Sequence, residues 1–194
     1  MASRSFDRSE LIARLANVFR HYGYEGASLA RITAATGLGK GSLYHAFPGG
    51  KEEMALAVLR ALDEATTAEI LHHLGGDHPP LAAFGLMFEG MRRHFDEGRR
   101  ICLIGAFALE GSHERFPRLI SGHFNGWRDS MADCLVRGGL KPAHATRLAL
   151  DILVAMEGGL VLARGLDDPS VFMEAIAHQE ARIAALLAAR QRTG

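Results

Sequence analysis

The chain has 194 residues, enough for one large domain or two small ones with a sizeable core. Hydrophobic residues make up 48% and charged residues 23%, which is ordinary for a globular protein. No apolar run reaches the ~18 residues of a membrane span, and the start lacks the apolar core of a signal peptide, so we expect a cytoplasmic protein. Two cysteines, Cys102 and Cys134, are too few for a disulfide framework, and we expect no metal site and no cofactor.

The formal net charge is zero, but the charged residues are unevenly distributed along the chain. The first 50 residues hold six basic residues and three acidic ones, so the rest of the chain carries the compensating negative charge. A basic segment at one end of a neutral chain is typical of a domain that faces nucleic acid.

The first predicted helix begins after Asp7, which can cap it, and runs to about Tyr22. Its apolar residues repeat at the spacing of one helical face; they are Leu11, Leu15, Val18, Phe19 and Tyr22. Gly23 follows and ends the helix.

Two short helices joined by a tight turn are predicted between residues 28 and 47. Ser28 is suited to cap the first helix, and Gly37 can take the left-handed conformation that ends it. Leu43 and Phe47 lie one turn apart on the inner face of the second helix. Its outer face is then polar and rich in hydroxyl groups, which is the plan of a helix-turn-helix that enters the DNA major groove. A plain packing pair of helices is the alternative.

The run from Ser28 to Lys51 resembles the DNA-binding domain of the TetR/AcrR repressor family, through Ile32, Gly37, Lys40-Gly41-Ser42-Leu43-Tyr44, Phe47 and Lys51. The loop 47–53 and the segment 102–107 are similar to the LmrA/YxaF-type branch of that family. Gly39 and Ala46 stand where polar residues are frequent, which removes two possible phosphate contacts. The expected DNA-binding residues are Ser28, Arg31, Lys40, Gly41, Ser42, Tyr44, His45 and Lys51.

The remaining chain reads as helices throughout. A long helix is expected from Lys51 to about His73, followed by a linker at residues 75–80. Further helices are expected over residues 81–97, 101–111, 117–137, 142–164 and 170–190, with 101–111 buried on all sides. We therefore predict an all-α chain of about nine helices. Residues 1–50 form a three-helix DNA-binding domain, and residues 51–194 form a helical effector-binding and dimerisation domain.

Large, soft side chains are concentrated between residues 84 and 131 and can line a pocket for a flat or apolar ligand, although they can equally be core. They are Phe84, Met87, Phe88, Met91, Phe95, Cys102, Phe107, Phe124, Trp127 and Met131. The resemblance implies that a small molecule bound here releases the DNA. Most polar neighbours, among them Glu110 and His123, are expected at the surface, and Cys102 is expected to be an inert buried thiol rather than a sensor.

The last two helices carry more apolar residues than one face needs, with Gly158-Gly159 and an Ala-rich run at 181–189. We expect them to form a four-helix homodimer interface, mostly on the resemblance, because two-fold pairing of half-sites increases specificity. A ligand-responsive repressor of operator DNA is therefore predicted. The alternatives are a helical DNA-binding protein without an effector and a small all-α enzyme, for which no catalytic or metal spacing is present.

Overall fold

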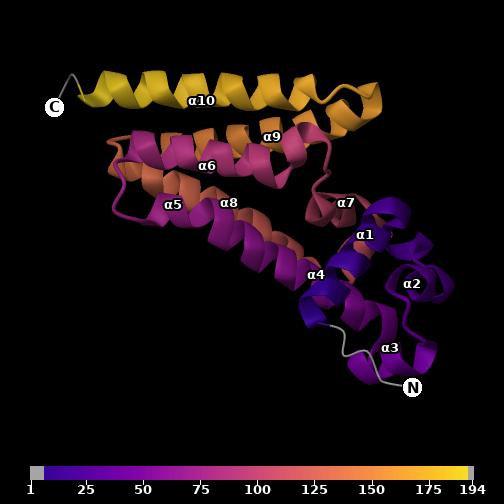
Figure 1. The fold of residues 1–194 in the computed structure, drawn as a ribbon. Coiled ribbons are helices and arrows are strands. Elements are labelled where there is room, and N and C mark those ends of the chain that lie inside the picture. The colour runs from indigo at the N-terminus through magenta and orange to yellow at the C-terminus, as the bar shows by residue number, and fades with distance from the viewer. Residues whose placement is uncertain (1–6, 192–194) are drawn as a thin grey trace. The chain divides into compact units, whose positions relative to one another are not determined.

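The structure is a computed structural model that describes residues 7–191, without the side chains of residues 112 and 113. Every regular element in that range is helical, which confirms the predicted all-α class (Figure 1). The α-helices are α1 Arg8–Gly26, α2 Leu29–Thr36, α3 Lys40–Ala46, α4 Gly50–Thr66, α5 His72–Gly75, α6 Pro80–His94, α7 Leu103–Leu109, α8 Pro117–Arg137, α9 Pro142–Leu166 and α10 Ser170–Gln191. A π-helical turn at Thr67–Leu71 makes α4 and α5 one continuous run.

The chain packs into two compact units. The first consists of the described residues through Glu64 together with Leu103–Ile120, and the second of Ala65–Cys102 together with the described residues from Ser121 onward. The first unit thus continues along α4 beyond residue 50. It also includes α7, which lies far from α1–α4 in the sequence.

Helix α1 begins where its sequence indicates, and its helical geometry is interrupted at Gly23, the residue predicted to end it. The Asp7 carboxylate accepts a hydrogen bond from the Ser9 amide at 3.2 Å, which caps the helix. Leu15 and Phe19 are buried, whereas Tyr22, predicted on the same face, is 40% exposed. The Arg31 guanidinium stacks on this exposed ring, with 4.1 Å from Cζ to the ring centroid.

The long helix predicted from Lys51 to His73 is not uniform. It changes from α to π geometry at Thr67, and the run ends at Gly75. Gly90 of α6 lies against this π turn, since a Cβ at Gly90 would be 3.1 Å from the Glu69 carbonyl oxygen. A side chain at position 90 would therefore push α6 away from the turn.

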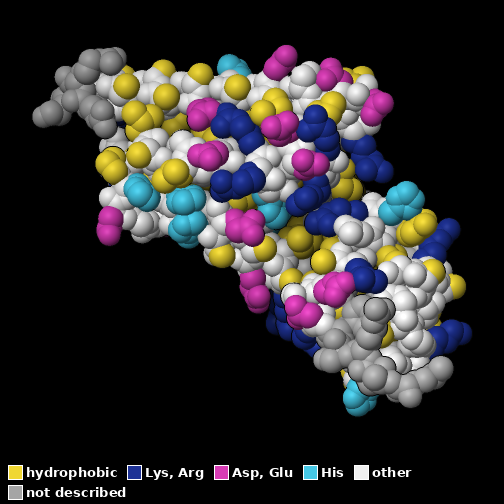
Figure 2. All heavy atoms as spheres, in the orientation of Figure 1, with side chains coloured by type: hydrophobic (Ala, Val, Ile, Leu, Met, Phe, Trp, Pro, Cys, Tyr) yellow, Lys and Arg dark blue, Asp and Glu magenta, His cyan; other side chains and the backbone are white. Residues whose placement is uncertain are grey.

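In the second unit α10 runs beside α9 and also packs against α6 (Figure 1). Phe172 of α10 and Trp127 of α8 are almost fully buried in its core. Gly98 has φ 94° and approaches Phe172 so closely that a Cβ there would lie 2.9 Å from the Phe172 Cβ. On the outside, acidic and basic side chains are interspersed over α6 and α10 (Figure 2), and one such pair joins Arg92 to Glu180.

Three expectations on burial were wrong. Leu109 is 82% exposed, because it is the last residue of α7 and, two positions after the buried Phe107, it points to the opposite side of the helix. Phe124 is only partly buried, while its neighbour His123 is buried beside the Trp127 ring at 5.8 Å between centroids. A polar side chain at position 123 therefore occupies an inner position that the pattern assigned to Phe124.

None of the helices within residues 7–191 is long and apolar enough to cross a membrane.

Candidate nucleic-acid interface

Helix α2 has defined ends. The Ser28 hydroxyl accepts a hydrogen bond from the Arg31 amide at 3.3 Å, which confirms Ser28 as the N-cap. At the other end Gly37 has φ 72°, and its amide donates to the Thr33 carbonyl at 2.9 Å. Ile32 is fully buried beneath the helix.

Helix α3 has the two faces that its sequence predicts. Leu43 and Phe47 are both 0% exposed, whereas Tyr44 between them is 50% exposed. The other residues predicted to contact DNA on this helix are also exposed; they are Lys40, Gly41, Ser42 and His45. The short helix is therefore anchored by two apolar side chains and presents its polar face outward.

The turn after α3 supports the Tyr44 side chain. Gly50 has φ 66°, and a Cβ on it would lie 3.4 Å from Tyr44 Cε1, so the ring lies against the glycine. The Gly50 amide donates to the Phe47 carbonyl at 2.9 Å. The Gly49 amide donates to the Glu53 carboxylate at 2.7 Å. These bonds hold the turn, so the position of the exposed ring is partly set before any ligand binds.

Side chains of α1 contact the end of α2 and the residue that follows α3. The Arg14 guanidinium donates to the carbonyl oxygens of Ala35 and Thr36 at 3.5 and 3.4 Å, and it pairs with Glu10 at 2.6 Å. These contacts satisfy carbonyl groups that the end of α2 leaves without helical partners. The guanidinium of Arg8 lies 5.2 Å from the Phe47 ring centroid.

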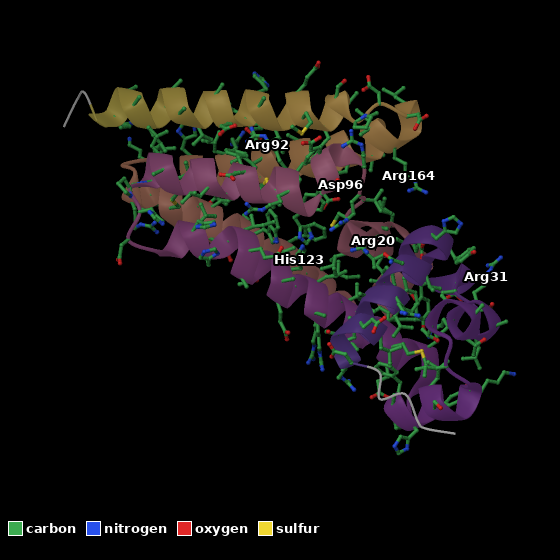
Figure 3. All side chains as sticks on the ribbon, viewed as in Figure 1. Arg20, Arg31, Arg92, Asp96, His123 and Arg164 are labelled. Carbon is green, nitrogen blue, oxygen red and sulfur yellow. The ribbon has the colours of Figure 1, made fainter. Side chains whose placement is uncertain are left out.

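Two of the predicted DNA-binding residues form hydrogen bonds with other groups of the same chain. Arg31, which projects from α2 (Figure 3), donates to the Gly26 carbonyl at 2.6 Å. The Lys51 ammonium donates to the Tyr24 carbonyl at 3.0 Å and lies 3.7 Å from the Glu25 carboxylate. Both side chains therefore tie α2 and α4 to the end of α1.

The side chains predicted to bind a ligand divide between the two units. Most of them lie in the second unit and are almost fully buried; these are Phe84, Met87, Phe88, Met91, Phe95, Trp127 and Met131. Phe107 belongs to the first unit, where its ring contacts Phe19 and Tyr24 with 5.8 Å between centroids in each pair. The sequence pattern could not separate these two sets, because both are apolar at helical spacing.

Sequence reasoning missed a group of buried polar atoms in the second unit. Among the described residues, Trp127 Nε1, Glu157 Oε1 and Gln179 Oε1 have no hydrogen-bond partner. Burial raises the pKa of the Glu157 carboxyl above its usual range, although a hydrogen bond with the Cys102 thiol acts in the opposite direction. The available signal was an acidic residue within the otherwise apolar run 152–163 of α9. Buried polar groups without partners are uncommon in proteins and fit a ligand-binding interior.

Comparison with known proteins gives two family matches. Residues 11–58 match the model described as bacterial regulatory proteins, tetR family. Residues 80–178 match the model described as transcriptional regulator LmrA/YxaF-like, C-terminal domain.

Individual relatives and structures agree with these models. The chain is 28% identical over 167 residues to the HTH-type transcriptional regulator YxaF of Bacillus subtilis, which covers 84% of this chain and 87% of YxaF. It is 24% identical over 160 residues to LmrA of Bacillus subtilis, covering 80% of this chain and 85% of LmrA. A TetR transcriptional regulator from Legionella pneumophila superimposes with a TM-score of 0.77 at 20% identity, over 93% of this chain and 99% of that one. The TetR family regulator CifR, solved with 26-base-pair operator DNA, superimposes with a TM-score of 0.66 at 25% identity, over 98% of each chain.

Proposed function

Because this chain belongs to the TetR family of transcriptional regulators, in its LmrA/YxaF-like branch, we propose that it is a repressor which a small apolar or aromatic molecule releases from operator DNA. The family consists of DNA-binding regulators, so the chain is a transcriptional regulator and not a small all-α enzyme. Since the target is chromosomal DNA, we propose a cytoplasmic site of action.

The orientation of α3 carries this proposal. Tyr44 is half exposed while Leu43 and Phe47 are fully buried, so the helix offers a polar surface on a rigid support. Lys40 and His45 are proposed to contact phosphates, Ser42 and Tyr44 base edges or the backbone, and Gly41 to allow close approach, since no atom lies within 4 Å of a Cβ built on it. Ser28 caps α2 and can also offer its hydroxyl group to a phosphate.

Arg31 and Lys51 are proposed to act mainly by holding the helix-turn-helix in place, and less by contacting DNA themselves. Their cationic groups already donate to the carbonyl oxygens of Gly26 and Tyr24. A side chain engaged in this way holds the helix-turn-helix against α1 and adds positive potential near the DNA. Both residues then influence operator binding, with a smaller direct contribution than Lys40.

The second unit is proposed to bind the effector. Its buried aromatic and methionine side chains form adaptable walls. The unpartnered atoms of Trp127, Glu157 and Gln179 favour a ligand that carries at least one polar group. Moving a two-state equilibrium from 1:99 to 99:1 requires about 5.5 kcal/mol of differential affinity, so the effector must bind the released state much more tightly.

A homodimer through α9 and α10 is proposed as the DNA-binding species. TetR-family regulators act on operator DNA as dimers, which fits the two-fold pairing of half-sites. On α9 a stripe of apolar side chains is exposed; it consists of Leu150, Val154, Val161, Leu162 and Leu166. On α10 the small residues Ala177, Ala181 and Ala185 are exposed at one-turn spacing. Exposed apolar side chains that follow one another along a helix are typical of an interaction surface.

Two experiments test the proposal. Selection of bound duplexes from a random pool should return a palindromic site, and Tyr44→Ala should weaken binding to it by about fivefold or more in a gel-shift titration, as expected for the loss of ~1–3 kcal/mol of contacts. Leu109→Ala removes another exposed side chain of the first unit and should leave affinity unchanged. Failure to select any site would contradict the regulator role.

A thermal-shift screen with flat aromatic compounds tests the effector separately. Stabilisation by at least one class, together with loss of DNA binding, is the expected result. If no compound stabilises the protein, the effector-independent DNA-binding protein becomes the better description.

A further inference from the structure

A pocket lies within the first unit, apart from the side chains assigned to the effector. It has a volume of about 540 Å³ and is formed by one face of α4 and by the segment that enters α8. Its lining residues are Glu52, Leu56, Arg60, Asp63, Arg115, Phe116, Pro117, Arg118 and Leu119. None of these side chains belongs to the set assigned to DNA or to the effector.

The pocket has an apolar side and a charged side. Phe116 is 5% exposed, and Leu56 and Leu119 are partly buried around it. Phe116 is itself fixed by the Tyr24 and Phe107 rings, at 5.7 and 6.0 Å between centroids. An apolar surface held this firmly can receive a flat or aliphatic group without rearranging.

Cationic groups outnumber carboxylates around this surface. Three arginines face two carboxylates, those of Glu52 and Asp63. The Arg115 guanidinium lies 3.6 Å from the Glu52 carboxylate, and since both side chains are about half exposed this pair is weak. Arg60 is exposed and has no hydrogen-bond or ion-pair partner among the described residues. The pocket therefore has a positive side with an available guanidinium group.

We propose that this pocket binds a small organic acid, whose carboxylate pairs with Arg60 and Arg115 and whose apolar body lies on Phe116, Leu56 and Leu119. Guanidinium groups match a carboxylate geometrically and form charge-assisted hydrogen bonds with it. Such a ligand joins α4 to the segment before α8. The chain passes between its two units after Glu64 and again after Ile120, so the ligand would stiffen two of the segments that lead to these crossings. The inference does not depend on the effector assignment.

The probe is 4-benzoylbenzoate, a photoreactive aromatic carboxylate, and its neutral control is 4-benzoylbenzamide. Calorimetry should show saturable binding of the acid and binding of the amide weaker by about tenfold or more, since the charge-assisted bonds are lost. Irradiation followed by peptide mapping should place the label in residues 52–63 or 115–119. Arg60→Gln and Arg115→Gln should each weaken binding of the acid by about tenfold. Arg93→Gln, which changes an exposed arginine of α6, should have no effect.

The proposal is overturned if the amide binds as well as the acid, or if the Arg60 and Arg115 variants bind like the unmodified chain. It is equally overturned if the label is confined to residues 84–102 and 121–131, because the probe then occupies the effector region. Absence of saturable binding at millimolar concentrations would also reject it. Loss of DNA binding by Tyr44→Ala is measured independently, so failure of one proposal does not imply failure of the other.

Discussion

The main-chain amide of Tyr24 donates a hydrogen bond to the Glu110 carboxylate, with 3.0 Å between nitrogen and oxygen. The two residues are 86 positions apart in the chain. The bond joins the interruption of α1 at Gly23 to the residue after α7, and the Phe107 and Phe116 rings pack against the Tyr24 ring. The segment Leu103–Ile120 is thereby part of the unit that carries the DNA-binding helices. A change in this segment consequently acts directly on the support of α2 and α3.

Removal of the Glu110 carboxylate should destabilise the first unit. In Glu110→Ala the partly buried Tyr24 amide loses its acceptor, and a polar group left without a partner costs about 1–3 kcal/mol. Urea unfolding should show that loss, and hydrogen exchange of the Tyr24 amide should accelerate. Glu89→Ala, which removes an exposed carboxylate of α6, is the matched control and should change neither quantity. Equal stability of the two variants would contradict the role assigned to Glu110.

Gly23 should be difficult to replace. Its backbone has φ 66° and ψ 177°, a region that essentially only glycine adopts, and a Cβ would also collide with the Glu110 carboxylate. Gly23→Ala should therefore reduce the free energy of unfolding by about 1–3 kcal/mol. Gly122→Ala in α8 has no atom within 4 Å of the added Cβ and should be neutral or stabilising by up to ~1 kcal/mol. Thermal unfolding of the two variants measures this difference in stability. If Gly23→Ala is as stable as the unmodified chain, the backbone at position 23 is not strained.

Lys40 should contribute to DNA affinity through the phosphates. Its side chain is exposed on α3, and each neutralised phosphate adds about 0.9 to the slope of log K against log salt. Lys40→Ala should weaken operator binding at low salt and reduce the slope by about 1. The titration is repeated at several salt concentrations with Lys141→Ala, a lysine of the second unit, as control. An unchanged slope would mean that Lys40 does not contact a phosphate.

Glu157 should make stability depend on pH. Burial raises the pKa of its carboxyl in the folded chain, so the folded chain binds this proton more tightly than the unfolded chain does. Its contribution to stability is therefore fully present below the unfolded pKa, about 4.3 for an ordinary Glu, and is lost as the pH rises through the higher folded pKa. Glu157→Gln keeps a neutral side chain at every pH. Relative to this variant, the unmodified chain should lose stability as the pH rises above about 4.3.

Unfolding free energies measured from about pH 4.3 upward show whether the unmodified chain loses stability relative to Glu157→Gln, as predicted. Glu174→Gln replaces an exposed carboxyl of α10 and serves as control, with a curve parallel to that of the unmodified chain. A Glu157→Gln curve that rises and falls in parallel with both would show that this carboxyl does not titrate differently on folding.

Charge on the exposed stripe of α9 should dissociate the proposed dimer. Val154 and Val161 are 71% and 56% exposed, so two arginines there should not disturb the core of one chain. The double variant V154R/V161R would bury like charges across a two-fold interface, which is strongly unfavourable. Sedimentation should show a monomer, with operator affinity reduced by more than about tenfold because one half-site is lost. Leu109→Arg, at an exposed apolar residue of the first unit, should remain a dimer.

The helices were largely predictable because they depend on local signals. Asp7, Ser28 and Gly37 act within a few residues of their own positions as caps and stops, and the structure uses all three in that way. The burial of Leu43 and Phe47 follows from one-turn spacing, a period that a short segment displays by itself. The π turn at Thr67–Leu71 carries no such signal, because it depends on packing against α6 at Gly90.

The candidate DNA interface was predictable for the same reason, since its exposed residues share one short helix. Lys51 and Arg31 behaved differently. Each lies beside the predicted interface in the sequence, but its charge is directed to a carbonyl oxygen at the end of α1. The partner of a long flexible cation depends on which main-chain groups are nearby in space, which periodicity does not encode.

The helical class, the helix ends at Asp7, Ser28 and Gly37, and the inward and outward faces of α3 all follow from local signals, because caps, glycine stops and apolar periodicity act over a few residues. The packing of Leu103–Ile120 with the DNA-binding helices, and of Phe107 against Phe19 in the first unit, became evident only from the folded arrangement. Long-range packing also leaves Glu157 partly buried and brings Arg60 and Arg115 to one pocket. These outcomes depend on contacts between residues far apart in the chain, and such contacts arise only when whole helices compete to bury their apolar faces.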